Sequence, residues 1–210
     1  VERARTHVGN LAHALKTPLS VLLNEARGDA GPLGPKVVEQ SEAMRHHLDL
    51  YLERARMAGR SRVLGAVTEI EPVLGSLVRA MERIYEGKTV ALAPSGGAPL
   101  RFRGERQNLE EMLGNLLDNA CKWASRSVDV TVGTAGTDDL EIVIDDDGPG
   151  LPAGRRQEAL RRGQRLDTTR PGSGLGLSIV AELVDLYEGT LTLDDAPGGG
   201  LRVRIVLPRA

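Results

Sequence analysis

Apolar side chains in the first 60 residues recur at alternating spacings of three and four, the repeat of helices that pack against one another. One stripe runs from Val8 to Leu22 and a second from Val37 to Ala55, with the Gly- and Pro-rich loop GDAGPLGP between them. Two such helices joined by a short loop predict an antiparallel hairpin over residues 1–60. A single hairpin cannot bury both stripes, so we expect two copies to form a four-helix bundle. The alternative is that both helices pack against the rest of the chain.

After a linker at residues 61–65, the pattern changes to alternating strands and amphipathic helices. Helices are expected at about 69–85, 105–124 and 175–187. Strands are expected at TVALA, LRFR, SVDVTV, LEIVID, GTLTL and LRVRIVL. Helices segregated from a mostly antiparallel or mixed sheet predict an α+β sandwich over residues 66–210.

Composition narrows the class of protein. A net charge of -2 gives no basic surface, so nucleic acid is not an expected partner. The single cysteine, Cys121, excludes a disulfide within the chain and fits a reducing compartment. No apolar run reaches the roughly 18 residues of a membrane span. Since the chain starts at Val1 without a methionine, we expect a fragment whose parent protein contacts any membrane through other parts.

The helix expected at 105–124 contains the segment NLLDNACKW. Asn115 and Asn119 are four residues apart and share one helical face, with Lys122 one turn further along it. Asparagine is a mediocre helix former because its amide competes for backbone hydrogen bonds, so two within one helix indicate a polar task. Amide oxygens suit Mg²⁺ and a lysine suits phosphate, whereas the alternative is a solvated helix face.

Two glycine-rich segments follow. In DDDGPG, Asp146 lies at the end of an expected strand, placed to accept a hydrogen bond from a buried donor such as an exocyclic amine. Gly148 and Gly150 predict a tight turn with a close backbone approach. In GSGLGLSIV, three glycines run into a helix whose exposed N–H groups form a candidate phosphate site. These glycines are Gly172, Gly174 and Gly176. Each motif alone is weak, because Asp-Gly and glycine-rich segments are common in turns.

The order and spacing of these three motifs within an α+β sandwich resemble the GHKL ATP-binding domain, over roughly residues 66–208. The resemblance implies that Asp146 binds the adenine amino group, that Asn119 binds Mg²⁺, and that residues 152–174 form a lid over ATP. Hydrolases with this fold carry a glutamate base four residues before the magnesium-binding asparagine. Here that position is Asn115, which cannot act as a base. The resemblance therefore favours transfer of phosphate to another acceptor over hydrolysis.

The acceptor is indicated by LAHALKTPLS in the first expected helix. His13 is two residues from both Leu11 and Leu15, so it points away from the apolar stripe, with Thr17 on its own face. Pro18 removes a helix hydrogen bond and predicts a bend near the histidine. A hairpin carrying such a histidine ahead of a GHKL domain resembles a sensor histidine kinase. The segments RGQRLDTTRPGSGLGL and DNACKW are close to the PhoQ type within that family.

This resemblance implies roles for further residues. Arg165 and Arg170 match lid arginines that contact phosphates, and Trp123 stands where an aromatic side chain packs against adenine. In related kinases a polar residue at the position of Thr17 positions water for dephosphorylation. Most histidine kinases carry an acid directly after the histidine, where this chain has Ala14. The expected catalytic residues are His13, Thr17, Lys122 and Arg170. The expected ATP-binding residues are Asn115, Asn119, Lys122, Trp123, Asp146, Gly148, Gly150, Arg165, Arg170, Gly172, Gly174 and Gly176, with Asn119 as the metal ligand.

We therefore expect the cytoplasmic part of a bacterial inner-membrane sensor histidine kinase that forms a homodimer and uses ATP and Mg²⁺. It would phosphorylate itself on His13, pass the phosphate to an aspartate of a response-regulator receiver domain, and also act as a phosphatase. Two alternatives stay open. One is a dimeric scaffold that binds nucleotide without catalysis, which is consistent with the missing acid at Ala14. The other is an anti-sigma-type protein-serine kinase.

Overall fold

The structure is a computed structural model of the 210-residue chain. It describes residues 66–93, 99–160 and 176–210 and, nearer the N-terminus, residues 18, 20–26, 31, 33–35, 37, 38, 40, 41 and 44. The chain forms two compact units, residues 1–64 and residues 65–210.

In the first unit, every described residue except Gly31 is helical. Leu23 is 3% exposed, whereas Leu22 is 48% exposed and Met44 is 52% exposed. Both exposed residues belong to the apolar stripes that predict the hairpin, so these stripe positions are not buried within a single chain. The remainder of the predicted hairpin lies outside the described residues.

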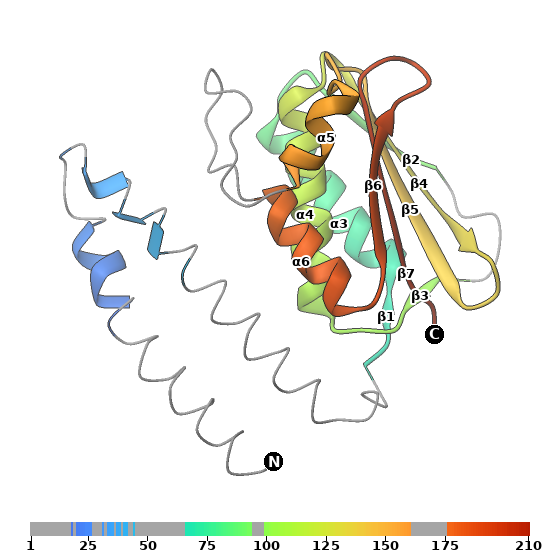
Figure 1. The fold of residues 1–210 in the computed structure, drawn as a ribbon, viewed down its shortest axis with the longest axis horizontal. Coiled ribbons are helices and arrows are strands. Elements are labelled where there is room, and N and C mark those ends of the chain that lie inside the picture. The colour runs from blue at the N-terminus through green and yellow to red at the C-terminus, as the bar shows by residue number, and fades with distance from the viewer. Residues whose placement is uncertain are drawn as a thin grey trace, which may run out of the picture. The chain divides into compact units, whose positions relative to one another are not determined.

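The second unit is built on a five-stranded sheet with the order β2-β4-β5-β7-β6 (Figure 1). Its strands are β2 (Thr89–Leu92), β4 (Ser127–Ala135), β5 (Asp139–Asp146), β6 (Thr190–Asp195) and β7 (Leu201–Pro208). Strand β2 runs parallel to β4, and the other neighbours are antiparallel. Alternate side chains are buried, as in LEIVID, where Leu140, Ile142 and Ile144 are at most 1% exposed. The sheet therefore presents one apolar face, and the prediction of a mixed sheet is confirmed.

Helices cover that apolar face and form the second layer (Figure 1). They are α3 (Ile70–Ile84), α4 (Arg106–Trp123), α5 (Ala153–Ala159) and α6 (Gly176–Leu186). Helix α4 contacts α3, α6 and the sheet, and its buried side chains recur at helical spacing. The predicted α+β sandwich is thus confirmed for this unit. Helix α5, in the segment between residues 152 and 174 for which a lid is expected, was not predicted.

A second, two-stranded sheet closes the base of this unit. It pairs β1 (Thr68–Glu69) with β3 (Arg101–Phe102) in antiparallel fashion. The Phe102 ring packs edge-on against Tyr187, with 4.8 Å between the ring centroids. The Thr68 hydroxyl donates a hydrogen bond to the Gly104 carbonyl (2.9 Å). These contacts fasten β1 and β3 to the segment before α4 and to the residue that follows α6.

Candidate functional site

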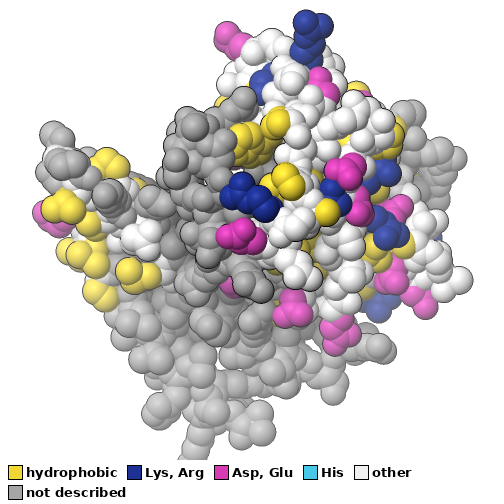
Figure 2. Space-filling view, turned by 45° about the horizontal axis from the view of Figure 1, so that its top comes forward, with side chains coloured by type: hydrophobic (Ala, Val, Ile, Leu, Met, Phe, Trp, Pro, Cys, Tyr) yellow, Lys and Arg dark blue, Asp and Glu magenta, His cyan; other side chains and the backbone are white. Residues whose placement is uncertain are grey.

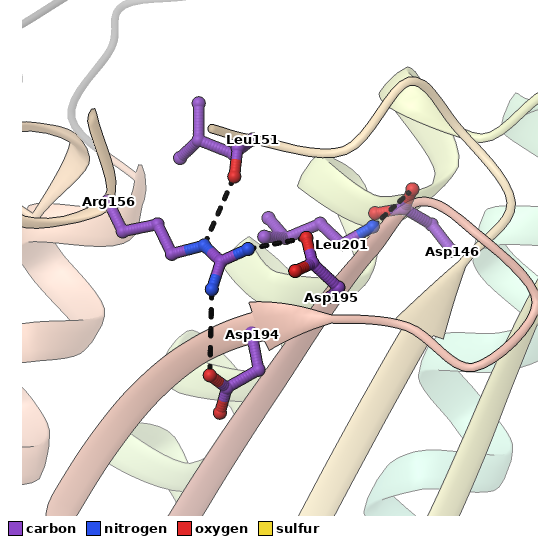
Figure 3. Close-up of polar contacts among 6 residues, drawn as sticks. All are labelled: Asp146, Leu151, Arg156, Asp194, Asp195 and Leu201. Atoms are coloured by element: carbon purple, nitrogen blue, oxygen red, sulfur yellow. Dashed lines mark hydrogen bonds and ion pairs between the residues drawn. The ribbon is translucent and has the colours of Figure 1, made fainter. Parts of the chain in front are cut away.

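Asp146 is the last residue of β5 and is 4% exposed. Its Oδ1 atom accepts two backbone hydrogen bonds, from Gly148 N–H (2.9 Å) and from Leu201 N–H (3.2 Å; Figure 3). Burial raises the pKa of the carboxyl group, and the two N–H donors partly oppose this shift. Within the described part of the chain, no residue donates a hydrogen bond to Oδ2. The site thus offers one buried acceptor atom to an external donor.

Three glycines allow the backbone to close around this carboxylate. A Cβ on Gly148 would lie 2.4 Å from the Trp123 carbonyl oxygen, and one on Gly200 would lie 1.9 Å from the Asp146 carbonyl oxygen. Gly150 and Gly200 also have positive φ angles, 71° and 86°. The close approach expected at Gly148 and Gly150 is present. Gly200 was missed because its partner is brought near only by the pairing of β7 with β5.

The C-terminal end of α4 is fastened next to this turn. The Asp147 carboxylate accepts hydrogen bonds from the backbone N–H groups of Ser125 (2.7 Å) and Arg126 (2.9 Å). These bonds, led by that from Arg126, lower the pKa of Asp147. From the other side, Lys88 Nζ donates to the carbonyls of Cys121 and Ala124, which end the helix. The end of α4 is therefore held by two charged side chains that sequence reasoning did not single out.

The motif NLLDNACKW places four expected site residues along α4, all of them half-buried. Asn115 Nδ2 donates to the Glu111 carbonyl one turn earlier (2.8 Å). A Cβ on Gly176 would lie 3.2 Å from Asn115 Oδ1, so the first residue of α6 lies against α4 at this point. Lys122 Nζ lies 5.5 Å from the centroid of the Trp123 ring, within the range of a cation–π contact.

The structure brings together Asp146, Gly148 and Trp123 at one end of α4 and Asn115 with Gly176 nearer its middle. Asn119, Lys122 and Gly150 are also described, whereas six expected site residues lie outside the described residues: His13, Thr17, Arg165, Arg170, Gly172 and Gly174. Among the residues that are described, no group of three or more His, Cys, Asp or Glu side chains is placed to hold a metal ion. The amide oxygens of α4 remain the candidate metal ligands.

Comparison with known proteins decides the family. Residues 104–210, about half of the chain, match the family described as histidine kinase-, DNA gyrase B- and HSP90-like ATPase. The chain belongs to this ATPase family. The matched range contains α4, the Asp146 turn and α6, so the GHKL resemblance drawn from the three motifs is confirmed at the level of the ATP-binding fold.

Curated relatives extend over both units of this ATPase-family chain. The sensor protein kinase CarS of Pseudomonas aeruginosa is 41% identical over 212 residues, which cover 99% of this chain and 47% of CarS. The sensor protein PhoQ of Escherichia coli is 34% identical over 215 residues, covering 99% of this chain and 44% of PhoQ. The chain thus spans less than half the length of these relatives.

A solved structure agrees with the fold. The mycobacterial sensor histidine kinase MprB is 30% identical, with a TM-score of 0.62 over 70% of this chain and 98% of the MprB chain. Within the described residues, no helix is both long and apolar enough to cross a membrane.

Proposed function

We propose that this chain is the catalytic core of a sensor histidine kinase, in which the second unit binds ATP and the first unit carries the acceptor, His13. The observation that carries the ATP assignment is the buried Asp146 carboxylate, whose Oδ1 is held by two N–H groups while Oδ2 is left to accept. The adenine amino group is the donor that such an atom fits. The acceptor assignment is supported by CarS and PhoQ, which align with 99% of the chain and so include the His13 segment.

The residues around the site fit a transfer of phosphate better than hydrolysis. Asn115 occupies the position at which hydrolases of this fold carry a glutamate, and an amide whose nitrogen donates to Glu111 cannot take a proton from water. In the transfer, an imidazole nitrogen of His13 forms a bond to the γ-phosphorus, and the bond from that phosphorus to the ADP oxygen breaks. The imidazole proton passes to a base, which Ala14 cannot supply.

The remaining roles follow the motif positions. Asn119 would be the protein ligand of Mg²⁺, which would neutralise charge on the ATP phosphates. Lys122, Arg165 and Arg170 would supply positive charge to the phosphates, and Trp123 would pack against adenine. Backbone N–H groups of the segment from Gly172 to Gly176 would hold phosphate oxygens. Such transfer depends mainly on positioning and charge.

The first unit is proposed to form the dimer. Four large apolar side chains of this unit are exposed in the single chain: Val21, Leu22, Leu33 and Met44. A second copy would cover them in a four-helix bundle. We further propose that phosphate passes from His13 to an aspartate of a response-regulator receiver domain. Thr17 would position water for the reverse, dephosphorylating activity. We also propose that the parent protein places this core on the cytoplasmic side of a bacterial inner membrane.

Labelling with γ-³²P-ATP tests the proposal against its two alternatives. We expect label that is lost in acid and retained in base, as for phosphohistidine, and absent from His13→Gln. Label that survives acid would indicate a protein-serine kinase. A chain that binds ATP but takes up no label would indicate a nucleotide-binding scaffold, the alternative that Ala14 keeps open.

A further inference from the structure

Arg156, on helix α5, has only 16% of its side chain exposed and contacts acceptors from two separate segments, the turn that follows Asp146 and the end of strand β6 (Figure 3). Its Nε donates to the Leu151 carbonyl oxygen (3.1 Å). Its Nη2 atom forms an ion pair with Asp195, and its Nη1 atom lies 3.6 Å from Oδ1 of Asp194. The proposed function gives this guanidinium group no role.

Both segments held by Arg156 border the candidate adenine site. Leu151 ends the turn that begins at Asp146. On the other side, Asp195 is paired with Leu201 across β6 and β7, and Leu201 N–H is one of the two donors to Asp146 Oδ1. The guanidinium group thus closes a ring of contacts that runs from Asp146 to Leu151, to Arg156, to Asp195 and Leu201, and back to Asp146.

We infer that Arg156 is a positioning residue for adenine recognition, which rests on the proposed ATP site. By holding the turn at residues 146–151 against the end of strand β6, Arg156 keeps Leu201 N–H on Oδ1 of Asp146. The second carboxylate oxygen then stays available for the amino group of the base. Without the guanidinium group, the two segments can separate, and Oδ2 no longer has one fixed place.

The chemistry of the contacts sets the size of the effect. A guanidinium group presents several N–H donors in one plane, so a single side chain can hold a carbonyl and two carboxylates at once. Asp194 and Asp195 are 62% and 80% exposed, so water and salt weaken their attraction for Arg156. The hydrogen bond to the Leu151 carbonyl is partly buried and is therefore less screened. We therefore expect a modest effect that is confined to the contact with the amino group and decreases at high salt.

The test compares ATP with purine riboside triphosphate, which lacks the 6-amino group. Calorimetry would give the Kd of each nucleotide for the full chain and for Arg156→Gln. The matched control is Arg155→Gln, which removes the same charge one residue away. The Arg155 side chain is 49% exposed, and its Nε lies 4.0 Å from Glu158 in the same helix. We expect Arg156→Gln to weaken ATP binding about three- to tenfold, the worth of one hydrogen bond, and to leave the analogue unchanged. Arg155→Gln should change neither Kd, and Arg156→Lys should fall between wild type and Arg156→Gln.

Equal weakening of both nucleotides, or an effect no larger than that of Arg155→Gln, would overturn the inference. If Arg156→Gln does not fold by circular dichroism, Asp195→Asn removes one arm of the same ring, and an unchanged preference for ATP in that variant overturns the inference as well. A wild-type chain that binds ATP and the analogue equally would contradict the adenine assignment of Asp146 itself, and this inference with it. A wild-type preference for ATP that survives in Arg156→Gln leaves the proposed function standing and removes only the role of Arg156.

Discussion

At the scale of single residues, Asp146 is set apart by how its two oxygens are used. Oδ1 accepts hydrogen bonds from the backbone N–H groups of Gly148 and Leu201. Because the side chain is buried, water could not easily replace the adenine amino group as the donor to Oδ2. The motif D-x-G-x-G predicts the carboxylate and its two glycines, because these constraints are local in sequence. Leu201 and Gly200 could not be predicted, since they reach Asp146 only through the register of β7 on β5.

Replacing this carboxylate tests its role in binding. Asp146→Ala removes the acceptor and leaves the adenine amine unpaired, a loss of about 1–3 kcal/mol, or about ten- to a hundredfold in ATP affinity. Isothermal titration calorimetry measures the change, with circular dichroism as the check on folding. Unchanged affinity in a folded variant would contradict the assignment.

The raised pKa of Asp146 predicts a pH dependence of binding. A proton on the carboxyl group would occupy Oδ2, the oxygen left for the amine, so ATP affinity should fall as the pH drops from 7 towards a pKa that lies above the ordinary 3.8. The effect on stability has the opposite sign, because the folded state binds this proton more tightly than the unfolded state. Titrations between pH 7 and 5 would measure the trend, with purine riboside triphosphate as the control ligand. If the preference for ATP over that analogue stays constant down to pH 5, protonation of the Asp146 carboxylate does not affect binding in that range.

At the scale of elements, helix α4 joins the core to the site. Its extent, and those of α3, α6, β5 and β7, agree with the predicted ranges to within about two residues, because long apolar periods specify them. Strand β1 has two residues and helix α5 reads AGRRQEA, so neither carries a periodic pattern long enough to detect. Arg156 and Asp195 are 39 residues apart in the chain, so no local sequence pattern predicts their contact.

The hydrogen bonds from the segment after α4 to Asp147 should contribute measurably to stability. Asp147→Ala leaves the N–H groups of Ser125 and Arg126 without their acceptor, which should lower the free energy of unfolding by about 1–2 kcal/mol at pH 7. The folded pKa of Asp147 is lowered, so its stabilisation is present above the ordinary 3.8 and is lost as the pH falls through the folded value. Urea unfolding at pH 7 and at pH 3 should therefore show a smaller difference between variant and wild type in acid. An equal difference at both pH values would mean that the carboxylate charge is not involved.

At the scale of the whole molecule, the two units carry different parts of the proposed activity. The core of the second unit is complete in itself, with side chains such as Phe102, Leu116 and Ile142 at most 1% exposed. The first unit instead exposes Leu22 and Met44 from its predicted stripes. The repeat in the sequence predicted these apolar faces, but it cannot tell a face used within one chain from a face used between two.

This division predicts the behaviour of a fragment. Residues 65–210 alone should be monomeric and should bind ATP as tightly as the full chain, because the apolar stripes lie outside the fragment and the Asp146 turn lies within it. Light scattering gives the mass and calorimetry the affinity. A dimeric fragment would move the proposed dimer interface into the second unit.

The central claim is that ATP held at Asp146 donates its γ-phosphate to His13, and one measurement tests it directly. The full chain is incubated with γ-³²P-ATP and Mg²⁺, and the label is quantified over time and mapped by mass spectrometry under non-acidic conditions. Wild type, His13→Gln and Asp146→Ala are compared after each has been shown to fold. We predict label on His13 in wild type, none in His13→Gln, and labelling at limiting ATP slowed about ten- to a hundredfold in Asp146→Ala, in line with its loss of affinity. Label that persists in His13→Gln, or a rate that Asp146→Ala leaves unchanged, would contradict the claim.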